Sequence, residues 1–164
     1  MRLRRFLDVP ELNVAVFAFL LNYPWEFLQV PLYLGMPEAS HWTAIRICTR
    51  ATVGDAIIML VSFWGVAAAT RTRWWVLRPG ARRLVGFVAA GVLITIVIER
   101  FAVRSDQPAW GWRYGEAMPI VPLIGVGLSP LMQWIVIPPL AAWFVKRQLG
   151  HLGRADLSRK SEAN

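Results

Sequence analysis

Charged residues and cysteine are both scarce in this sequence of 164 residues. Charged side chains make up 17% of the chain, whereas a soluble domain of ordinary composition carries about 25%. The single cysteine, Cys48, cannot form an internal disulfide, a redox pair or a zinc knuckle. The low charge argues against a soluble globular domain and a disordered chain, and the lone cysteine argues against a disulfide-stabilised secreted domain.

The signatures of common enzyme classes are also missing. The chain contains no glycine-rich dinucleotide or phosphate loop, no HExxH zinc motif and no GxSxG nucleophile turn. Neither His41 nor His151 has a second histidine or a cysteine at metal-ligand spacing. We therefore expect no bound cofactor and no transition-metal site, although a hard cation held by carboxylates and carbonyl groups stays open.

Long apolar runs dominate what the sequence does contain. It is 56% hydrophobic with a mean hydropathy of +0.44, and about 20 apolar residues are enough to cross a bilayer as a helix. We predict an all-α membrane protein: residues 1–150 form a single domain, a bundle of four transmembrane helices, and residues 151–164 form a short polar cytoplasmic tail. The four predicted spans are residues 12–34, 48–69, 84–103 and 117–145.

Local patterns predict where the helices begin and how they meet. Asp8 and Glu11 form a capping-box pattern ahead of the first apolar run, and Ser40 is a candidate N-cap for the second. Gly65 and Gly86 each begin a pair of small residues four positions apart, on the second and third spans. Because such pairs let helices approach closely in lipid, we expect helix contacts at both positions.

Proline predicts kinks in the first and fourth helices. Pro24 and Pro31 interrupt the first apolar run on either side of Glu26. In the fourth run, Ser129 and Pro130 follow two glycines, a pattern that predicts a broken helix. A second half-helix starting at Pro130 would place its N-terminus in mid-membrane, where such breaks mark substrate or ion sites.

Basic residues are distributed unevenly between the predicted loops. Most of the 18 lysines and arginines lie in the N-terminal segment, the loop 71–83 and the residues after 145. The positive-inside rule then places both termini in the cytoplasm, and we expect a bacterial inner membrane. Tryptophans near the ends of the spans are predicted to anchor the helices at the membrane interface: Trp42, Trp74, Trp75, Trp110, Trp112 and Trp143.

Four carboxylic acids fall at similar depth on the predicted outer side: Glu26, Asp55, Glu99 and Glu116. An ionisable side chain within a transmembrane helix costs about 2.5–3.5 kcal/mol, so each of these acids needs a reason to be there. One explanation is structural, namely ion pairs with Arg50 or Arg100. The other is functional, and we favour it for Glu26 and Asp55 because both lie well inside apolar runs.

The polar residues of each span fall on one face of the predicted helix. Asn22, Glu26 and Gln29 follow i, i+4, i+7 spacing, and similar stripes run along the other three spans. If the stripes face one another they build a shared pocket, with Glu26 and Asp55 as its catalytic centre. The predicted ligand-binding residues around that centre are Asn22, Tyr23, Trp25, Gln29, Arg50, Thr95, Glu99, Arg100, Glu116, Ser129, Gln133 and Trp134.

Three functions fit this pattern, and whether the protein is an enzyme stays open. The leading hypothesis is an outward-facing pocket that binds a small amphiphilic or lipid-like ligand and processes it by acid–base chemistry, because two carboxyl groups in one apolar pocket resist ionising together. The alternatives are a proton-coupled small-molecule carrier and a non-catalytic accessory subunit of a larger membrane complex. We expect contact with membrane lipids and no contact with nucleic acid, and a membrane-protein partner or a homo-oligomer stays open.

Overall fold

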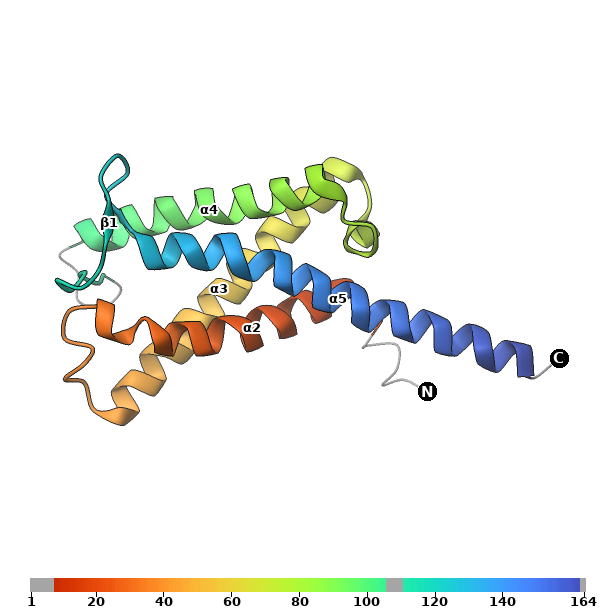
Figure 1. Ribbon diagram of the computed structural model, residues 1–164, viewed down its shortest axis with the longest axis horizontal. Helices are drawn as coiled ribbons and strands as arrows, with labels where there is room; N and C mark the ends of the chain where they lie inside the picture. The colour runs from red at the N-terminus through yellow and green to blue at the C-terminus, as the bar shows by residue number, and fades with distance from the viewer. Residues whose placement is uncertain (1–7, 106–110, 163–164) are drawn as a thin grey trace.

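The computed structural model describes residues 8–105 and 111–162, with residues 151–162 described by their backbone alone. The described chain is mostly helical, as its composition predicts (Figure 1). Its elements, in chain order, are the helix α2 (Pro10–Leu28), the 3-10 turn η1 (Val30–Leu32), the helix α3 (His41–Thr70), the 3-10 turn η2 (Arg73–Leu77), the helix α4 (Gly80–Arg104), the strands β1 (Ile120–Val121) and β2 (Val126–Gly127), and the helix α5 (Leu128–Glu162).

The four long helices pack as a bundle. Both α2 and α4 contact α3 and α5, so the helices close a ring in the order α2, α3, α4, α5. The loop after α2 and the β1–β2 hairpin lie at one end of the bundle, which we call the cavity end (Figure 1). At the other end, the core end, η2 packs beside α2, α3 and α5. Past the core end, α5 continues as a helix through residues that the sequence predicts to be a polar tail.

The beginnings of α2 and α3 show one prediction confirmed and one that is wrong. Ser40 caps α3, because its hydroxyl accepts a hydrogen bond from the backbone N–H of Thr43 at 3.3 Å. In α2 the N-cap is Val9, without a side-chain cap, so Asp8 does not form the predicted capping box. Pro10 begins the helix instead, at a position where a missing N–H costs nothing.

The proline-rich entry to α5 also differs from the prediction. The sequence predicts a helix break before Pro130, inside a span that starts at residue 117. In the structure, β1 and β2 pair as a short antiparallel hairpin, and α5 begins directly after it at Leu128. Gly125 makes the turn of this hairpin with a φ of 64°, which side chains other than glycine rarely adopt. Pro24 lies within α2, which continues past it as a helix.

Three helices in the described part of the chain are long and apolar enough to cross a membrane: His41–Thr70, Gly80–Arg104 and Leu128–Gly150. The 19-residue α2 is not among them, and its apolar sequence is interrupted by Asn13, Asn22 and Glu26. Large apolar side chains are nevertheless exposed on all four helices, among them Leu20, Ile57, Leu93 and Ile135. Length, composition and apolar outer faces all support membrane insertion.

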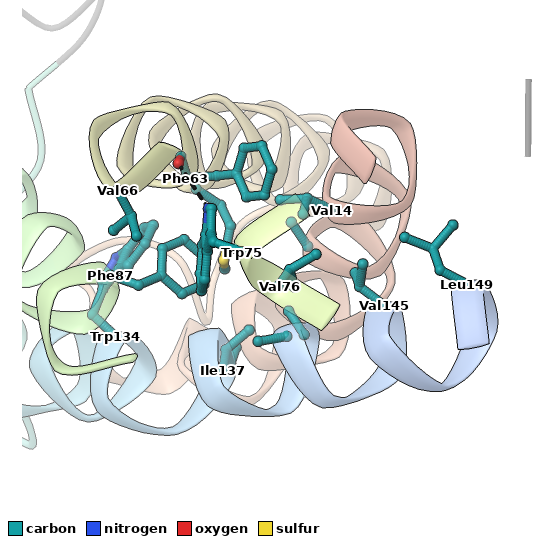
Figure 2. Packing of buried hydrophobic residues seen from close by; sticks show 14 residues of the cluster. Val14, Phe63, Val66, Trp75, Val76, Phe87, Trp134, Ile137, Val145 and Leu149 are labelled. Carbon is teal, nitrogen blue, oxygen red and sulfur yellow. Dashed lines mark hydrogen bonds between the residues drawn. The ribbon is translucent and has the colours of Figure 1, made fainter. Parts of the chain in front are cut away.

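A dense apolar cluster fills the core end (Figure 2). Trp75 from η2 is 1% exposed, and its ring lies 5.4 Å from that of Phe63 and 5.3 Å from that of Phe87. Its indole N–H donates to the backbone carbonyl of Phe63 at 3.3 Å, so its one polar group is satisfied. The predicted role of Trp75 as a membrane anchor is therefore wrong. Trp42, Trp74 and Trp143 are exposed, as anchors need to be, and Trp110 lies outside the described residues together with Arg2, Arg4 and Arg5.

Glycine marks one close helix contact, at a position that the small-residue pairs do not predict. At Gly65 an added Cβ would meet no atom within 4 Å, so the predicted contact there is wrong. At Gly86 it would meet a methyl group of Val66 at 3.9 Å, an ordinary contact. At Gly91, by contrast, an added Cβ would collide with the ring of Trp134. Gly91 therefore lets Trp134 of α5 lie directly against α4.

Candidate functional site

A single side chain, Gln133 of α5, joins the polar stripes of three helices. Its amide nitrogen donates to the side-chain oxygens of Asn22 at 2.8 Å, Asp55 at 2.9 Å and Glu26 at 3.3 Å. An amide nitrogen has two hydrogens, so three acceptors share two donors. Because Asn22 and Glu26 belong to α2 and Asp55 belongs to α3, this contact ties α2, α3 and α5 together.

Gln29 extends the same network. Its amide nitrogen donates to Oε1 of Glu26 at 2.7 Å, and its oxygen accepts from the hydroxyl of Ser129 at 3.0 Å. The carboxyl groups of Glu26 and Asp55 thus both accept from one donor, the amide of Gln133. The network therefore brings the acids of α2 and α3 to one point.

The network is buried and its members satisfy one another. Asn22 is 1% exposed, Gln133 2%, Gln29 5% and Glu26 9%, while Asp55 is half-buried. Burying an unpaired amide or carboxyl group costs several kcal/mol in an apolar medium, on the order of 2–7 kcal/mol for a neutral group. The hydrogen bonds among these side chains offset that cost.

Arginine does not neutralise the two acids. The guanidinium of Arg100 donates to the backbone carbonyl of Ile124 at 2.7 Å, and Arg50 is exposed. Across the side chains that the structure describes, no ion pair joins Glu26 or Asp55 to a basic residue. The structural explanation for these acids, a buried ion pair, is not the arrangement that the chain adopts.

A cavity of about 760 Å³ lies beside the network at the cavity end of the bundle. It is bounded by all four helices and by the loops around residues 33–39 and 111–113. Its volume falls within the range of small-molecule sites, roughly 300–1,000 Å³. Ile47, Ile58 and Ile98 supply apolar wall, and the acids Glu26 and Asp55 face the same space.

Glu99 of α4 also lines the cavity, but its partners come from a loop. Its Oε2 accepts from the indole N–H of Trp112 at 3.0 Å and from the hydroxyl of Tyr114 at 2.5 Å. Burial and the neighbouring Glu99 raise the pKa of the Tyr114 phenol above its ordinary value, so the phenol stays protonated and acts as the donor. These two bonds fasten the loop before β1 to the last turns of α4.

Thr95 lines the cavity one helical turn before Glu99. It is 5% exposed, and its hydroxyl is buried with no hydrogen-bond partner among the residues that the structure describes. Trp134, 1% exposed, contributes its ring to the same wall. Thr95 is therefore a cavity-lining residue whose buried hydroxyl has no partner among the described residues.

Most of the predicted site residues come together around this cavity. Asn22 and Ser129 do not line it, but both belong to the hydrogen-bond network beside it. The predicted residues that line the cavity directly are Glu26, Gln29, Arg50, Asp55, Thr95, Glu99, Gln133 and Trp134.

Four of the predicted ligand-binding residues lie elsewhere. Tyr23 packs against the rings of Phe19 and Phe27, at centroid distances of 5.7 and 5.1 Å. Trp25 packs against the apolar cluster of the core end, Arg100 is bound to the carbonyl of Ile124, and Glu116 is exposed outside the cavity.

Sequence reasoning missed Cys48 and the segment 112–114. The thiol of Cys48 lines the cavity and donates to the backbone carbonyl of Glu26 at 3.7 Å. Trp112 is predicted only as a membrane anchor, whereas it is half-buried and bound to Glu99. The run of aromatic and basic residues at 112–114 is a visible signal, but no spacing rule connects that loop to Glu99.

Within the described residues, no group of three or more His, Cys, Asp or Glu side chains is placed to hold a metal ion. No family model matches the chain, and no curated protein or solved structure is significantly similar to it. The class therefore follows from the fold and the site alone. This is a mostly helical protein with three helices long and apolar enough to cross a membrane, and an acidic, amide-rich cavity between its helices.

Proposed function

We propose that the chain is a multi-pass protein of the bacterial inner membrane and that its cavity binds a small amphiphilic or lipid-like molecule. In this proposal all four helices cross the membrane, since the 19 residues of α2 span about 28 Å at 1.5 Å per residue. Both termini lie in the cytoplasm, as the basic loop 71–83 and the basic residues after 145 favour. The cavity end then faces the outer side.

One observation carries the proposal: the amide of Gln133 holds Glu26 and Asp55 together at the wall of a cavity. Ionisable residues inside a membrane bundle are costly, and they are retained where they line a substrate or ion path. A cavity with apolar walls and a few convergent polar groups is the usual form of a small-molecule site.

A proton-coupled carrier is the second candidate, favoured because Glu26 and Asp55 are both bound to the amide of Gln133. Two carboxyl groups held close together in an apolar setting resist ionising together, and a proton kept by one of them can be released when a ligand enters. This property suits acid–base chemistry and coupled transport equally. An accessory subunit requires a polar stripe on the outside of the bundle. The burial of Asn22, Gln29 and Gln133 does not support that role.

Two glycines on α3 offer a matched test of the cavity. Gly54 lines the cavity and Gly65 does not, and an added Cβ would meet no atom within 4 Å at either position. The substitution G54F introduces a ring at a cavity-lining position, and G65F introduces the same side chain on α3 outside the cavity. The probe is decanol carrying an alkyl diazirine, photolysed with the protein in lipid nanodiscs, and the labelled residues are mapped by mass spectrometry.

We expect wild-type protein to be labelled in the segment 47–58 and around Thr95, and an excess of unlabelled decanol to remove that labelling. We expect G65F to keep the labelling that unlabelled decanol removes, and G54F to lose it. The proposed function is contradicted if unlabelled decanol does not remove the labelling. It is also contradicted if the labelling decreases by the same amount in G54F and G65F.

A further inference from the structure

The charges that face the cavity are predominantly acidic. Glu26, Asp55 and Glu99 all line it, from three different helices. Arg50 and Arg113 line it as well, but both side chains are exposed, and neither forms an ion pair with another residue that the structure describes. The buried part of the cavity therefore presents oxygen acceptors and carboxyl groups without a fixed positive charge.

Aromatic rings line the same space. Trp112, Trp134 and Tyr33 contribute to the wall, and the ring of Tyr33 lies 5.8 Å from that of Tyr114. The face of an aromatic ring attracts a cation, most strongly where water is excluded. Rings combined with carboxylates are thus suited to an organic ammonium group, because the rings attract its charge and also contact its alkyl substituents.

The unpartnered hydroxyl of Thr95 is a second and independent sign that the cavity takes a ligand. It is buried at the wall with no hydrogen-bond partner among the described residues, although a buried hydroxyl normally has one. Thr95 lies one turn from Glu99 on α4, and both residues line the cavity. A polar head group beside Glu99 is a candidate partner for this hydroxyl.

We infer that the cavity binds an amphiphile whose head group is a cationic nitrogen, a primary to quaternary ammonium group on an apolar chain. This inference rests on the proposed function and narrows its ligand class. The head group lies between Glu26, Asp55 and Glu99, and the chain runs along the isoleucine wall. An anionic head group would be repelled by the carboxylates, and a neutral one would leave them without a counter-charge in an apolar setting.

Three probes with the same chain and different charge test the inference: hexyltrimethylammonium, 1-hexanol and hexyl sulfate. Each is titrated by calorimetry into the full-length protein in nanodiscs of zwitterionic lipid, with protein-free nanodiscs subtracted. We expect hexyltrimethylammonium to bind at least about tenfold more tightly than either of the others, since one charge contact of ordinary strength accounts for a factor of ten. This comparison within the wild-type protein does not depend on the folding of any variant.

The double substitution E26Q and D55N removes two acids while keeping the size and most hydrogen bonds of the side chains. We expect it to weaken the affinity for hexyltrimethylammonium about tenfold and to change the affinity for 1-hexanol by less than about twofold. The control is E38Q, which removes an exposed carboxylate that does not line the cavity. We expect E38Q to leave the affinities for all three probes unchanged.

Equal or tighter binding of 1-hexanol or hexyl sulfate overturns the cationic ligand class. The proposed function still stands in that case if the decanol labelling distinguishes G54F from G65F. If the labelling does not distinguish G54F from G65F either, the cationic ligand class and the proposed function are both contradicted. An unchanged affinity of the double variant for the ammonium probe overturns the role of Glu26 and Asp55 in binding it.

Discussion

The two ends of the bundle differ in what holds them together. At the core end, Trp75 packs between Phe63 and Phe87, and its only polar group bonds to the backbone. At the cavity end, Gln133 donates hydrogen bonds to side chains of α2 and α3 beside a space of about 760 Å³. Trp134, one residue further along α5, belongs to both the core cluster and the cavity wall.

Under the proposed function, this difference places stability at one end of the bundle and ligand binding at the other. Close-packed apolar side chains stabilise a fold because removing any of them leaves a void. A buried polar network contributes less net stability, since each hydrogen bond replaces one made elsewhere, but it fixes the positions of specific chemical groups. We therefore expect substitutions at the core end to unfold the protein and substitutions at the cavity end to change binding.

The largest effect on stability is expected from W75A. It removes a buried ring and leaves a void among Phe63 and Phe87, at a cost of about 3–5 kcal/mol in the free energy of unfolding. Denaturation by dodecyl sulfate in mixed micelles measures this. The neighbouring W74A is the control, because Trp74 is exposed, and its effect stays within about 0.5 kcal/mol. Equal losses in the two variants would show that η2 does not pack into the core.

A smaller loss is expected from G91A. The added methyl group collides with the ring of Trp134 and forces α4 and α5 apart, which costs about 1–3 kcal/mol. G86A is the matched control on the same helix, where the new methyl group makes an ordinary contact with Val66. The same denaturation assay measures both. If G91A is as stable as G86A, then Trp134 does not lie against α4 as described.

The smallest change in stability is expected from D55N. Asparagine keeps the size of the side chain and the oxygen that accepts from Gln133, so the free energy of unfolding falls by no more than about 1 kcal/mol. Binding of hexyltrimethylammonium nevertheless weakens, because an acid is lost from the cavity. A loss of stability as large as that of W75A would assign Asp55 to the structure rather than to the site.

Local sequence patterns predict the helices and much of the site. The cap at Ser40 is a short-range feature, and it is confirmed. The stripe of Asn22, Glu26 and Gln29 follows from helical phase alone, and in the structure all three are buried on the inner face of α2. Polar side chains are costly to expose to lipid, so they have to face the interior of the bundle. The sequence therefore predicts that the polar faces of the helices meet, although it does not predict that they meet at Gln133.

Tertiary contacts explain what the sequence does not predict. The apolar run 117–145 is predicted as one span with a helix break before Pro130, but its first part forms the β1–β2 hairpin, since hydropathy does not distinguish a turn of apolar residues from a span. Trp75 and Trp112 both resemble interface anchors, yet one fills the core and the other bonds to Glu99. These partners lie 12 and 13 residues away from them along the chain, beyond the reach of helical periodicity.

The central claim is that Gln133 brings the acids of two helices together at the cavity. Solid-state NMR in lipid bilayers tests it directly, with glutamine labelled by ¹⁵N at the side-chain amide and aspartate labelled by ¹³C at the carboxyl carbon. The structure predicts a short-range cross peak between a glutamine amide nitrogen and an aspartate carboxyl carbon, present in the wild type and lost in Q133L. If the wild type shows no such cross peak, the acids do not share the amide of Gln133, and the site described here does not exist.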